Sequence, residues 1–338
     1  MTSFFSGGAK APRKLKLAPP ALLALVLAGC DWAGRFRLPL VDPAGAARTL
    51  EVVSVEPAPV LDRGAKGEFD AVDVLNPSVV EFGGGLWNFY SGFDGTRWHT
   101  GVARWSGGGW SKQGRVLEAV DYIAANGSAV VTADGEFLYW YQAGRLPQIG
   151  LARSRDGKNF QKESAPVLQP GPYRSWDERG VADPYVIRRG EFYYLYYTGL
   201  DRAQRQQLGL ARSRDGVHWE KNAANPILEL GPEPIEEGGL GEPSVFSAGG
   251  AYWMLYTGRA WDEQRRILLA RSEDGVAWKR VPGWVFAGRE AWNRKVVCDP
   301  AVVVGSDGMV RMWFGGGDVA SPDERLNGKI GVATLRPM

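Results

Sequence analysis

The sequence has few of the residues that bind metals or form disulfide bonds. Its 338 residues include only two cysteines, two histidines and five methionines. No Cys/His spacing typical of a metal site is present, and no serine–histidine arrangement for nucleophilic catalysis. No glycine-rich phosphate loop precedes a helix either. We therefore expect no metal site and no cofactor.

The chain also lacks a strong excess of either charge. Its formal charge is +2, and the first 29 residues carry Lys10, Arg13, Lys14 and Lys16 without any acid. The rest of the chain therefore has a formal charge of −2. Because no basic stripe remains, the sequence argues against nucleic-acid binding.

Long apolar runs are missing as well. The run from Ala18 to Leu27 contains two prolines and is too short to span a bilayer. It ends in Leu27-Ala28-Gly29-Cys30, which resembles the lipobox of bacterial lipoproteins, so we predict a signal peptide over residues 1–29 and lipidation of Cys30. The alternative is an ordinary secretory signal with an incidental cysteine. The lipid would hold the protein on the bacterial cell envelope after export across the inner membrane, with residues 30–48 as a tether.

What the chain has in abundance is glycine (45), proline (21) and tryptophan (14), which suits short strands joined by tight turns. A repeat of three strand-like runs recurs along it. The second run is aromatic, and the third reads Gly-Leu-Ala-Arg or a close variant. Three copies continue with Ser-x-Asp-Gly, at Ser154, Ser213 and Ser272, each 59 residues after the previous one. The first runs begin at Asn76-Pro77, Asn126-Gly127, Asp183-Pro184, Glu242-Pro243 and Asp299-Pro300.

Five copies of about four strands predict an all-β fold, a five-bladed β-propeller with four-stranded antiparallel blades. The fifth copy ends after its third strand, so we expect the strand Leu50–Val55 to complete it and close the ring. The propeller forms one domain over residues 49–338.

The residues that open the first strands should meet at the propeller axis. We call them the lead residues: Asn76, Asn126, Asp183, Glu242 and Asp299. Converging carboxyl groups repel one another, so the pKa of at least one should rise. The alternative is that these side chains only cap the starts of strands.

The lead acids, the aromatic second strands and the Ser-x-Asp-Gly turns resemble the five-bladed glycoside hydrolase superfamily, which includes families 43, 32, 68 and 130. The resemblance covers about Val52 to Leu335 and implies action on glycosidic bonds of an oligo- or polysaccharide. Family 43 carries Asp, Asp and Glu on its first three blades as base, pKa modulator and acid. Here the resemblance implies Glu242 as proton donor and Asp183 as modulator, whereas Asn126 stands at the base position. Asp299, or Asp73 near Asn76, would then be the base or nucleophile.

Further residues of the same end are candidate sugar contacts: Asn76, Asn126, Asp73, Arg259, Trp176, Trp261 and Trp292. Two other functions remain open. One is a surface propeller that binds carbohydrate without catalysis, which the two lead asparagines favour. The other is a protein-interaction scaffold. We expect a monomer whose partners are a carbohydrate and, through the lipid, a membrane. The sequence leaves open hydrolysis or phosphorolysis.

Overall fold

The computed structural model describes residues 36–39 and 46–338. Within this part of the chain the regular elements are strands and one short 3-10 helix, η1 (Pro234–Glu236). No helix in the described residues is long and apolar enough to cross a membrane. The prediction of an all-β fold is confirmed. The predicted signal peptide and Cys30 lie outside the described residues.

Three antiparallel sheets each contain four strands that follow one another along the chain. The first sheet consists of β2 (Asp73–Phe82), β3 (Gly85–Phe93), β4 (Trp98–Trp105) and β5 (Trp110–Leu117). The second sheet consists of β6 (Ala124–Val131), β7 (Phe137–Ala143), β8 (Gln148–Ser154) and β9 (Gln161–Lys162). The third sheet consists of β10 (Gly180–Arg189), β11 (Phe192–Leu200), β12 (Gln206–Ser213) and β13 (Glu220–Lys221).

The fourth sheet has eight strands in two halves, which a single bridge between Arg265 and Val296 joins. One half consists of β14 (Gly239–Ala248), β15 (Ala251–Arg259), β16 (Arg265–Ser272) and β17 (Lys279–Phe286). The other consists of β18 (Val296–Val304), β19 (Val310–Gly317), β20 (Lys329–Pro337) and β1 (Leu50–Val55). Strand β1 pairs antiparallel with β20, so the start of the fold lies beside its end.

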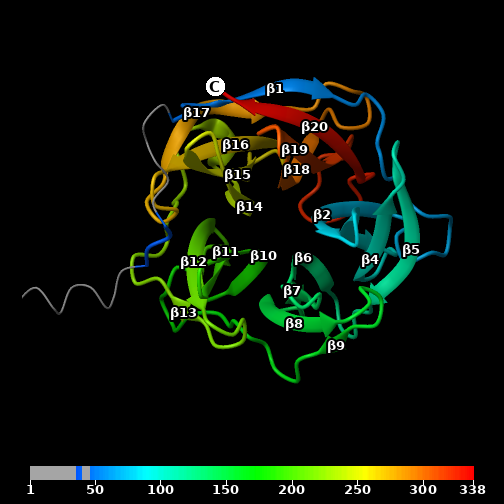
Figure 1. Cartoon of the computed structure of the whole chain (residues 1–338), viewed down its shortest axis with the longest axis horizontal. Helices are drawn as coiled ribbons and strands as arrows, with labels where there is room; N and C mark the ends of the chain where they lie inside the picture. Colours follow the sequence, from blue (N-terminus) through cyan, green and yellow to red (C-terminus); the bar gives the residue numbers. More distant parts are fainter. Residues whose placement is uncertain (1–35, 40–45) are drawn as a thin grey trace, which may run out of the picture. The chain divides into compact units, whose positions relative to one another are not determined.

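The first strand of each group lies innermost. Strands β2, β6, β10, β14 and β18 contact one another in cyclic order, and β18 contacts β2. Figure 1 shows these strands around a central axis, with the later strands of each sheet farther out. Residues that open these strands are therefore brought together although they are far apart in sequence.

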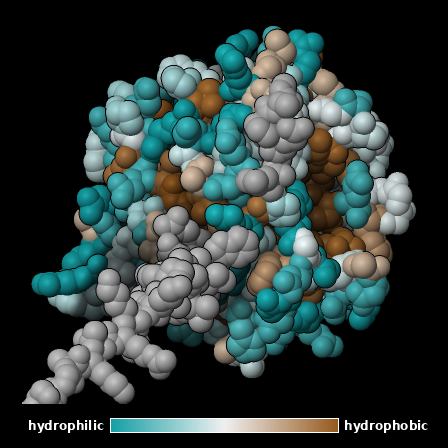
Figure 2. Space-filling view, turned by 60° about the vertical axis from the view of Figure 1, so that its left-hand side comes forward, coloured by the Kyte–Doolittle hydropathy of each residue, from teal (hydrophilic) through white to brown (hydrophobic). Residues whose placement is uncertain are grey.

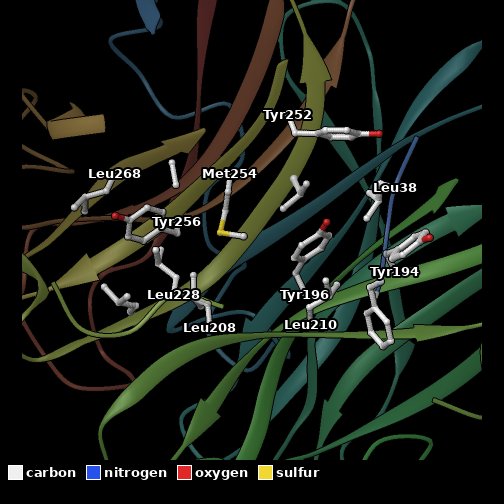
Figure 3. Packing of buried hydrophobic residues seen from close by; sticks show 14 residues of the cluster. Leu38, Tyr194, Tyr196, Leu208, Leu210, Leu228, Tyr252, Met254, Tyr256 and Leu268 are labelled. Atoms are coloured by element: carbon white, nitrogen blue, oxygen red, sulfur yellow. The ribbon is translucent and has the colours of Figure 1, made fainter. Parts of the chain in front are cut away.

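Apolar side chains fill the space between neighbouring sheets. Figure 3 shows the cluster between the third sheet and the half that begins with β14, where Tyr194 and Tyr196 of β11 meet Met254 and Tyr256 of β15. Each of these side chains is at most 2% exposed. Burying such side chains is worth about 1.5–3 kcal/mol each, so packing between sheets holds the arrangement. On the face shown in Figure 2, hydrophilic residues predominate and apolar ones lie mostly in recesses between them.

The three Ser-x-Asp-Gly sequences form identical turns between third and fourth strands. In the turn at Ser213, the serine Oγ lies 2.9 Å from Asp215 Oδ1 and accepts the Gly216 amide at 2.9 Å. Gly216 has φ +79°, a conformation that glycine adopts at little cost. The Trp140 indole of the second sheet donates to the Gly216 carbonyl at 2.8 Å, so the turn also links two sheets.

Residues 36–39 fall within the predicted tether but pack on the fold. Phe36 and Leu38 are 3% and 2% exposed, and Leu38 lies beside Tyr194 (Figure 3). The Tyr194 hydroxyl donates to the Arg37 carbonyl at 2.8 Å, and the Leu38 amide donates to Asp274 O at 3.3 Å. Because two apolar side chains are buried here, this part of the segment is held in place and is not a free tether.

Candidate active site

The five lead residues share an unusual backbone conformation. Their φ angles lie between +46° and +56°. Residues other than glycine rarely adopt this left-handed region, at a cost of roughly 1–3 kcal/mol each. At each lead residue the pairing of the inner strand with the next strand shifts register, as in a β-bulge. The same strain at five equivalent positions presents five side chains in the same way.

The bulge takes the backbone amides of the lead residues out of regular strand pairing. Hydroxyl groups on the second strands of neighbouring sheets accept hydrogen bonds from three of these amides. The bonds run from Asn126 N to Ser91 Oγ (2.9 Å), from Glu242 N to Thr198 Oγ1 (3.3 Å) and from Asp299 N to Thr257 Oγ1 (3.2 Å). These hydroxyls were missed in the sequence. They stand at one position of the repeat, and this polar column in an otherwise aromatic strand is the signal that could have revealed them.

All five lead side chains line one cavity of about 250 Å³. The cavity is also lined by Arg259, Arg265 and Tyr122. The structure therefore brings the predicted lead residues together, as their equivalent places in the repeat require.

Carboxyl groups in this cavity do not ionise independently. Burial raises the pKa of Asp183 to about 7, and the charge of Glu242 adds to the shift. Bonds from the Thr198 hydroxyl and the Asn126 amide group, whose Nδ2 lies 3.4 Å from Asp183 Oδ1, partly offset it. Burial and Glu242 also raise the pKa of Asp299 well above its ordinary value. Asp183 therefore still holds its proton part of the time near neutral pH.

Arg265 is a buried cation at this site that sequence reasoning missed. It is 6% exposed, and its guanidinium donates to the carbonyls of Ser321 and Pro322. Burial works against its charge, but the acidic groups of Cys298, Glu242 and Asp299 raise its pKa. The charge of Arg265 works against the raised pKa values of Asp183 and Asp299, but burial and Glu242 outweigh it.

Asp299 is held more tightly than the other two acids. Its Oδ1 accepts Asn76 Nδ2 at 2.8 Å, and its Oδ2 accepts the Asn76 amide and the Cys298 thiol, each at 3.1 Å. The side chain is 5% exposed. Glu242 in turn accepts the Asp299 amide on Oε2 at 3.1 Å. Asp299 therefore has the contacts of a group that shapes the cavity floor.

Asp73 does not reach the cavity. It is fully buried and accepts the amides of Arg325 and Gly328 at 2.5 and 2.8 Å. Burial raises the pKa of this carboxyl, and the two amides work against the rise. Its carboxylate is engaged in fixing the loop before β20.

Of the predicted sugar contacts outside the lead residues, only Arg259 lines the cavity, where Glu263 Oε2 lies 2.7 Å from its Nε. Trp176 and Trp292 stand seven residues before a lead residue and lie over glycines instead. A side chain at Gly199 would meet the Trp176 ring at 2.2 Å. Trp292 stacks on Phe314 with ring centroids 5.9 Å apart. Trp261 is 73% exposed and is not part of the cavity lining.

A second set of buried acids lies six residues before three of the lead residues. Each binds a tyrosine of the second strand and a cation of the fourth strand, and we call each set a triad. In the third sheet, Asp177 Oδ2 accepts Tyr197 Oη at 3.2 Å and Lys221 Nζ at 2.5 Å. The other triads are Asp70–Tyr90–Lys112 and Glu236–Tyr256–Arg280. These acids are at most 1% exposed, and each is neutralised within its own sheet.

The sequence profile of the family described as "Glycosyl hydrolases family 32 N-terminal domain" matches residues 124–292, half of the chain. The chain belongs to this family. The matched part of this family 32 chain begins at β6 and ends before β18, so it includes Asn126, Asp183 and Glu242. The resemblance to propeller glycoside hydrolases predicted from the sequence is confirmed.

Individual proteins similar to this family 32 chain include an uncharacterized protein, MT1551, of Mycobacterium tuberculosis (strain CDC 1551 / Oshkosh). It is 27% identical over 227 residues, which is 61% of this chain and 75% of that protein. The 1,2-beta-oligomannan phosphorylase of Thermoanaerobacter sp. (strain X514) is 28% identical over 124 residues, 34% of this chain and 41% of that enzyme. A solved structure of the Bombyx mori GH32 beta-fructofuranosidase BmSUC1 has a TM-score of 0.61 at 19% identity, covering 82% of this chain and 62% of that chain. At this identity the structural likeness concerns the fold.

Proposed function

We propose that this protein cleaves glycosidic bonds of an oligo- or polysaccharide in the axial cavity, with Asp183 and Glu242 as its proton source. One observation carries the proposal: two partly accessible carboxyl groups share a cavity, and the pKa of one lies at about 7. Glycosidic cleavage needs a carboxylic acid that is still protonated at the working pH, close to an ionised one.

Hydrogen bonding supports different roles for the two acids of this pair. Asp183 is held by Asn126 and Thr198, whereas Glu242 accepts the Asp299 amide only on Oε2. The Glu242 side chain is half-buried in the cavity lining and also forms a hydrogen bond with the Asp299 carboxyl group. We therefore assign proton delivery to Glu242 and tuning of its proton to Asp183. The charge of Glu242 helps to raise the pKa of Asp183 to about 7, so the proton of Asp183 depends on its neighbour.

Neither Asn126 nor Asp299 is well suited to the role of base or nucleophile. Asn126 is a neutral amide at the position where the family resemblance implies a base. Burial and Glu242 raise the pKa of Asp299 well above its ordinary value, and Asn76 and Cys298 already bond its carboxyl group, so it suits a base poorly. Both hydrolysis and phosphorolysis are therefore tested, and Arg145, Arg259 and Arg265 are cavity cations that an attacking phosphate could meet.

The experiment compares the wild type with Glu242→Gln on a broad panel of oligosaccharides and aryl glycosides, each in buffer with and without inorganic phosphate. We expect turnover by the wild type, and loss of turnover with retained binding in Glu242→Gln. Glu237→Gln, at an exposed position five residues earlier, is the control and should keep full activity. A wild-type protein that is inert on the whole panel would overturn the proposal.

A second function, carbohydrate binding without catalysis, is favoured by the lead asparagines. Asn76 and Asn126 put amide groups where two further carboxylates would otherwise stand in the cavity. This function predicts that the wild type and Glu242→Gln both bind a glycan of the panel and that neither cleaves it.

We also propose that the fold is a five-bladed propeller closed by β1. The cyclic contacts of the five inner strands and the pairing of β1 with β20 support it. Deleting residues 46–56 should then expose the edge of β20 and cause aggregation, which light scattering would detect. A deletion variant that stays monomeric and equally stable would contradict the closure.

We further propose that the protein is lipid-anchored at Cys30 on the cell envelope. The basic start of the chain, the short apolar run and the Leu-Ala-Gly-Cys sequence support this proposal. The wild type should sediment with membranes and carry a lipid mass on its N-terminal peptide. Cys30→Ser should be found in the soluble fraction, whereas equal membrane association of both forms would contradict the anchor.

A further inference from the structure

The connection between the first and second sheets is unusually short. Nine positions separate Leu117 from the lead residue Asn126, whereas fifteen separate Leu168 from Asp183 at the equivalent place in the third sheet. The shortening removes the loop that carries the acid of the triads. Val120 stands six residues before Asn126 and is 86% exposed.

The second sheet contains the other two members of a triad, Tyr141 and Lys162, in the usual positions. Lys162 Nζ lies 5.8 Å from the centroid of the Tyr141 ring, as Lys221 Nζ does from that of Tyr197. Lys162 donates to the Glu118 carbonyl at 2.7 Å, and Lys221 donates to the carbonyl of Gln169 at 2.8 Å. The second sheet therefore keeps the tyrosine and the cation of a triad in the geometry that holds a carboxylate elsewhere.

The fourth sheet shows the contrasting case, in which the whole triad has changed. In its half that contains β1, the corresponding residues are Asn293, Phe314 and Val55, so cation and hydroxyl disappear together with the acid. In the second sheet, the Tyr141 hydroxyl has no hydrogen-bond partner among residues 36–39 and 46–338. Tyr141 and Lys162 thus form a polar pair without an acid of their own sheet, which indicates that the acid comes from a bound ligand.

A hollow of about 650 Å³ lies at this place, lined by Lys162, Arg97, Phe160, Glu118 and Val120. Lys162 is an exposed residue, and partial burial lowers the pKa of its ammonium group while the charge of Glu118 works against this. The Glu118 carboxylate is turned toward solvent, 61% exposed and 3.4 Å from Arg115. Besides Glu118, whose charge also acts on Lys162, the hollow thus offers the cations Arg97 and Lys162 to an incoming acid.

We propose that this hollow binds the carboxylate of a uronate residue in the glycan that occupies the axial cavity. The choice of a glycan rests on the proposed function. Tyr122 and Ile123 of the same short connection line the axial cavity, so a glycan that leaves this cavity over the connection arrives at the hollow. Lys162, which lines the hollow beside the ring of Tyr141, then binds the carboxylate as Lys221 binds Asp177.

A peptide ligand fits less well because of Ala143. In the other sheets the residue before each triad acid packs over a glycine of the second strand, as Trp176 does over Gly199. Ala143 stands at the position of Gly199, and its methyl group occupies that space. A partner segment with an apolar residue followed by an acid would clash there, whereas a lone carboxylate would not.

The test measures binding of D-glucuronate and D-galacturonate to the wild type, to Lys162→Met and to Lys158→Met by calorimetry and by NMR titration. The methyl esters of both sugars serve as uncharged probes. We expect binding of at least one uronate, with its ester about tenfold weaker or more, since a hydrogen bond to a charged group is worth roughly 1.5–3 kcal/mol. Lys162→Met should lose the preference for the acid, and Lys158→Met, an exposed lysine outside the hollow, should keep it.

Two outcomes overturn the inference. One is equal binding of acid and ester by the wild type or an unchanged preference in Lys162→Met. The other is tighter binding of the dipeptide N-acetyl-Trp-Asp-amide than of both uronates, which would assign the hollow to an acidic protein segment. Glu242→Gln should bind uronates as the wild type does, so failure of catalysis and failure of this site are separate results.

Discussion

Asp177 is buried just before β10 and Asp183 is half-buried within β10, and the surroundings of the two acids are opposite. Asp177 has Lys221 at 2.5 Å and Tyr197 at 3.2 Å, all from its own sheet. Asp183 has neutral hydrogen-bond donors and the acid Glu242 from the neighbouring sheet, and the charge of Arg265 acts on it only as the smallest influence. The difference arises because each sheet supplies its own cation away from the axis, whereas near the axis the sheets bring acid against acid. Burial alone therefore does not identify a candidate catalytic carboxylate. The charge of the group beside the carboxylate is the more informative property.

The largest effect should separate these two aspartates by activity. Asp183→Asn removes the group that tunes the shared proton, so we expect turnover of a substrate found in the panel to fall by about 10²–10⁴-fold. Asp177→Asn should leave turnover per folded molecule nearly unchanged, because Asp177 does not line the cavity. Steady-state kinetics, normalised to the folded fraction by circular dichroism, checks both. Similar losses in the two variants would remove the distinction between the two sets of acids.

The next effect concerns stability and should appear only in the triads. Lys221→Met leaves Asp177, which is 1% exposed, as a buried acid without its cation. Breaking a buried pair in this way costs roughly 3–5 kcal/mol. Lys162→Met removes the equivalent lysine of the second sheet, where no acid is left behind, and should cost less than about 1 kcal/mol. Urea unfolding of both variants measures the contrast, and equal losses would contradict the assignment of the triads.

The pH dependence of stability should come from the axial acids. The pKa of Asp183 is raised to about 7 in the folded protein from an unfolded value of 3.8. Between these values the folded chain holds a proton that the unfolded chain releases, so stability falls as pH rises through this window. The expected loss is a few kcal/mol between about pH 4 and pH 7. Asp183→Asn should flatten this part of the profile and be more stable than the wild type at pH 8, and an unchanged profile would contradict the raised pKa.

Much of the fold was predictable from the sequence because the repeat is local. Aromatic second strands, Gly-Leu-Ala-Arg third strands and Ser-x-Asp-Gly turns each indicate their own element, and the lead residues converge because they hold equivalent places. The site beyond them depends on which neighbour each side chain meets. Trp176 and Trp292 stand in site-end loops, and only packing reveals that they lie over glycines. Asp73 is close to a lead residue in sequence, but its carboxylate accepts hydrogen bonds from backbone amides of the loop before β20. Arg265 reaches the axis from the start of β16, a position without any repeat signal.

The smallest effect tests whether the lead position is strained. Asn126 has φ +49°, and its amide side chain bonds Ser91, Gln142 and Asp183. Alanine and glycine both remove these bonds, but only alanine keeps the left-handed strain. We therefore expect Asn126→Gly to be more stable than Asn126→Ala by about 1 kcal/mol or slightly more.

The control lies in the same strand. Val131 is an ordinary strand residue paired with Phe137, and there glycine should be less stable than alanine by about 0.5–1 kcal/mol. Thermal unfolding of the four variants gives both differences. If the bulge, and not the amide side chain alone, holds the lead residue toward the axis, the difference in stability between the glycine and the alanine variant must have opposite signs at the two positions. The same sign at both would mean that Asn126 is held by its hydrogen bonds only.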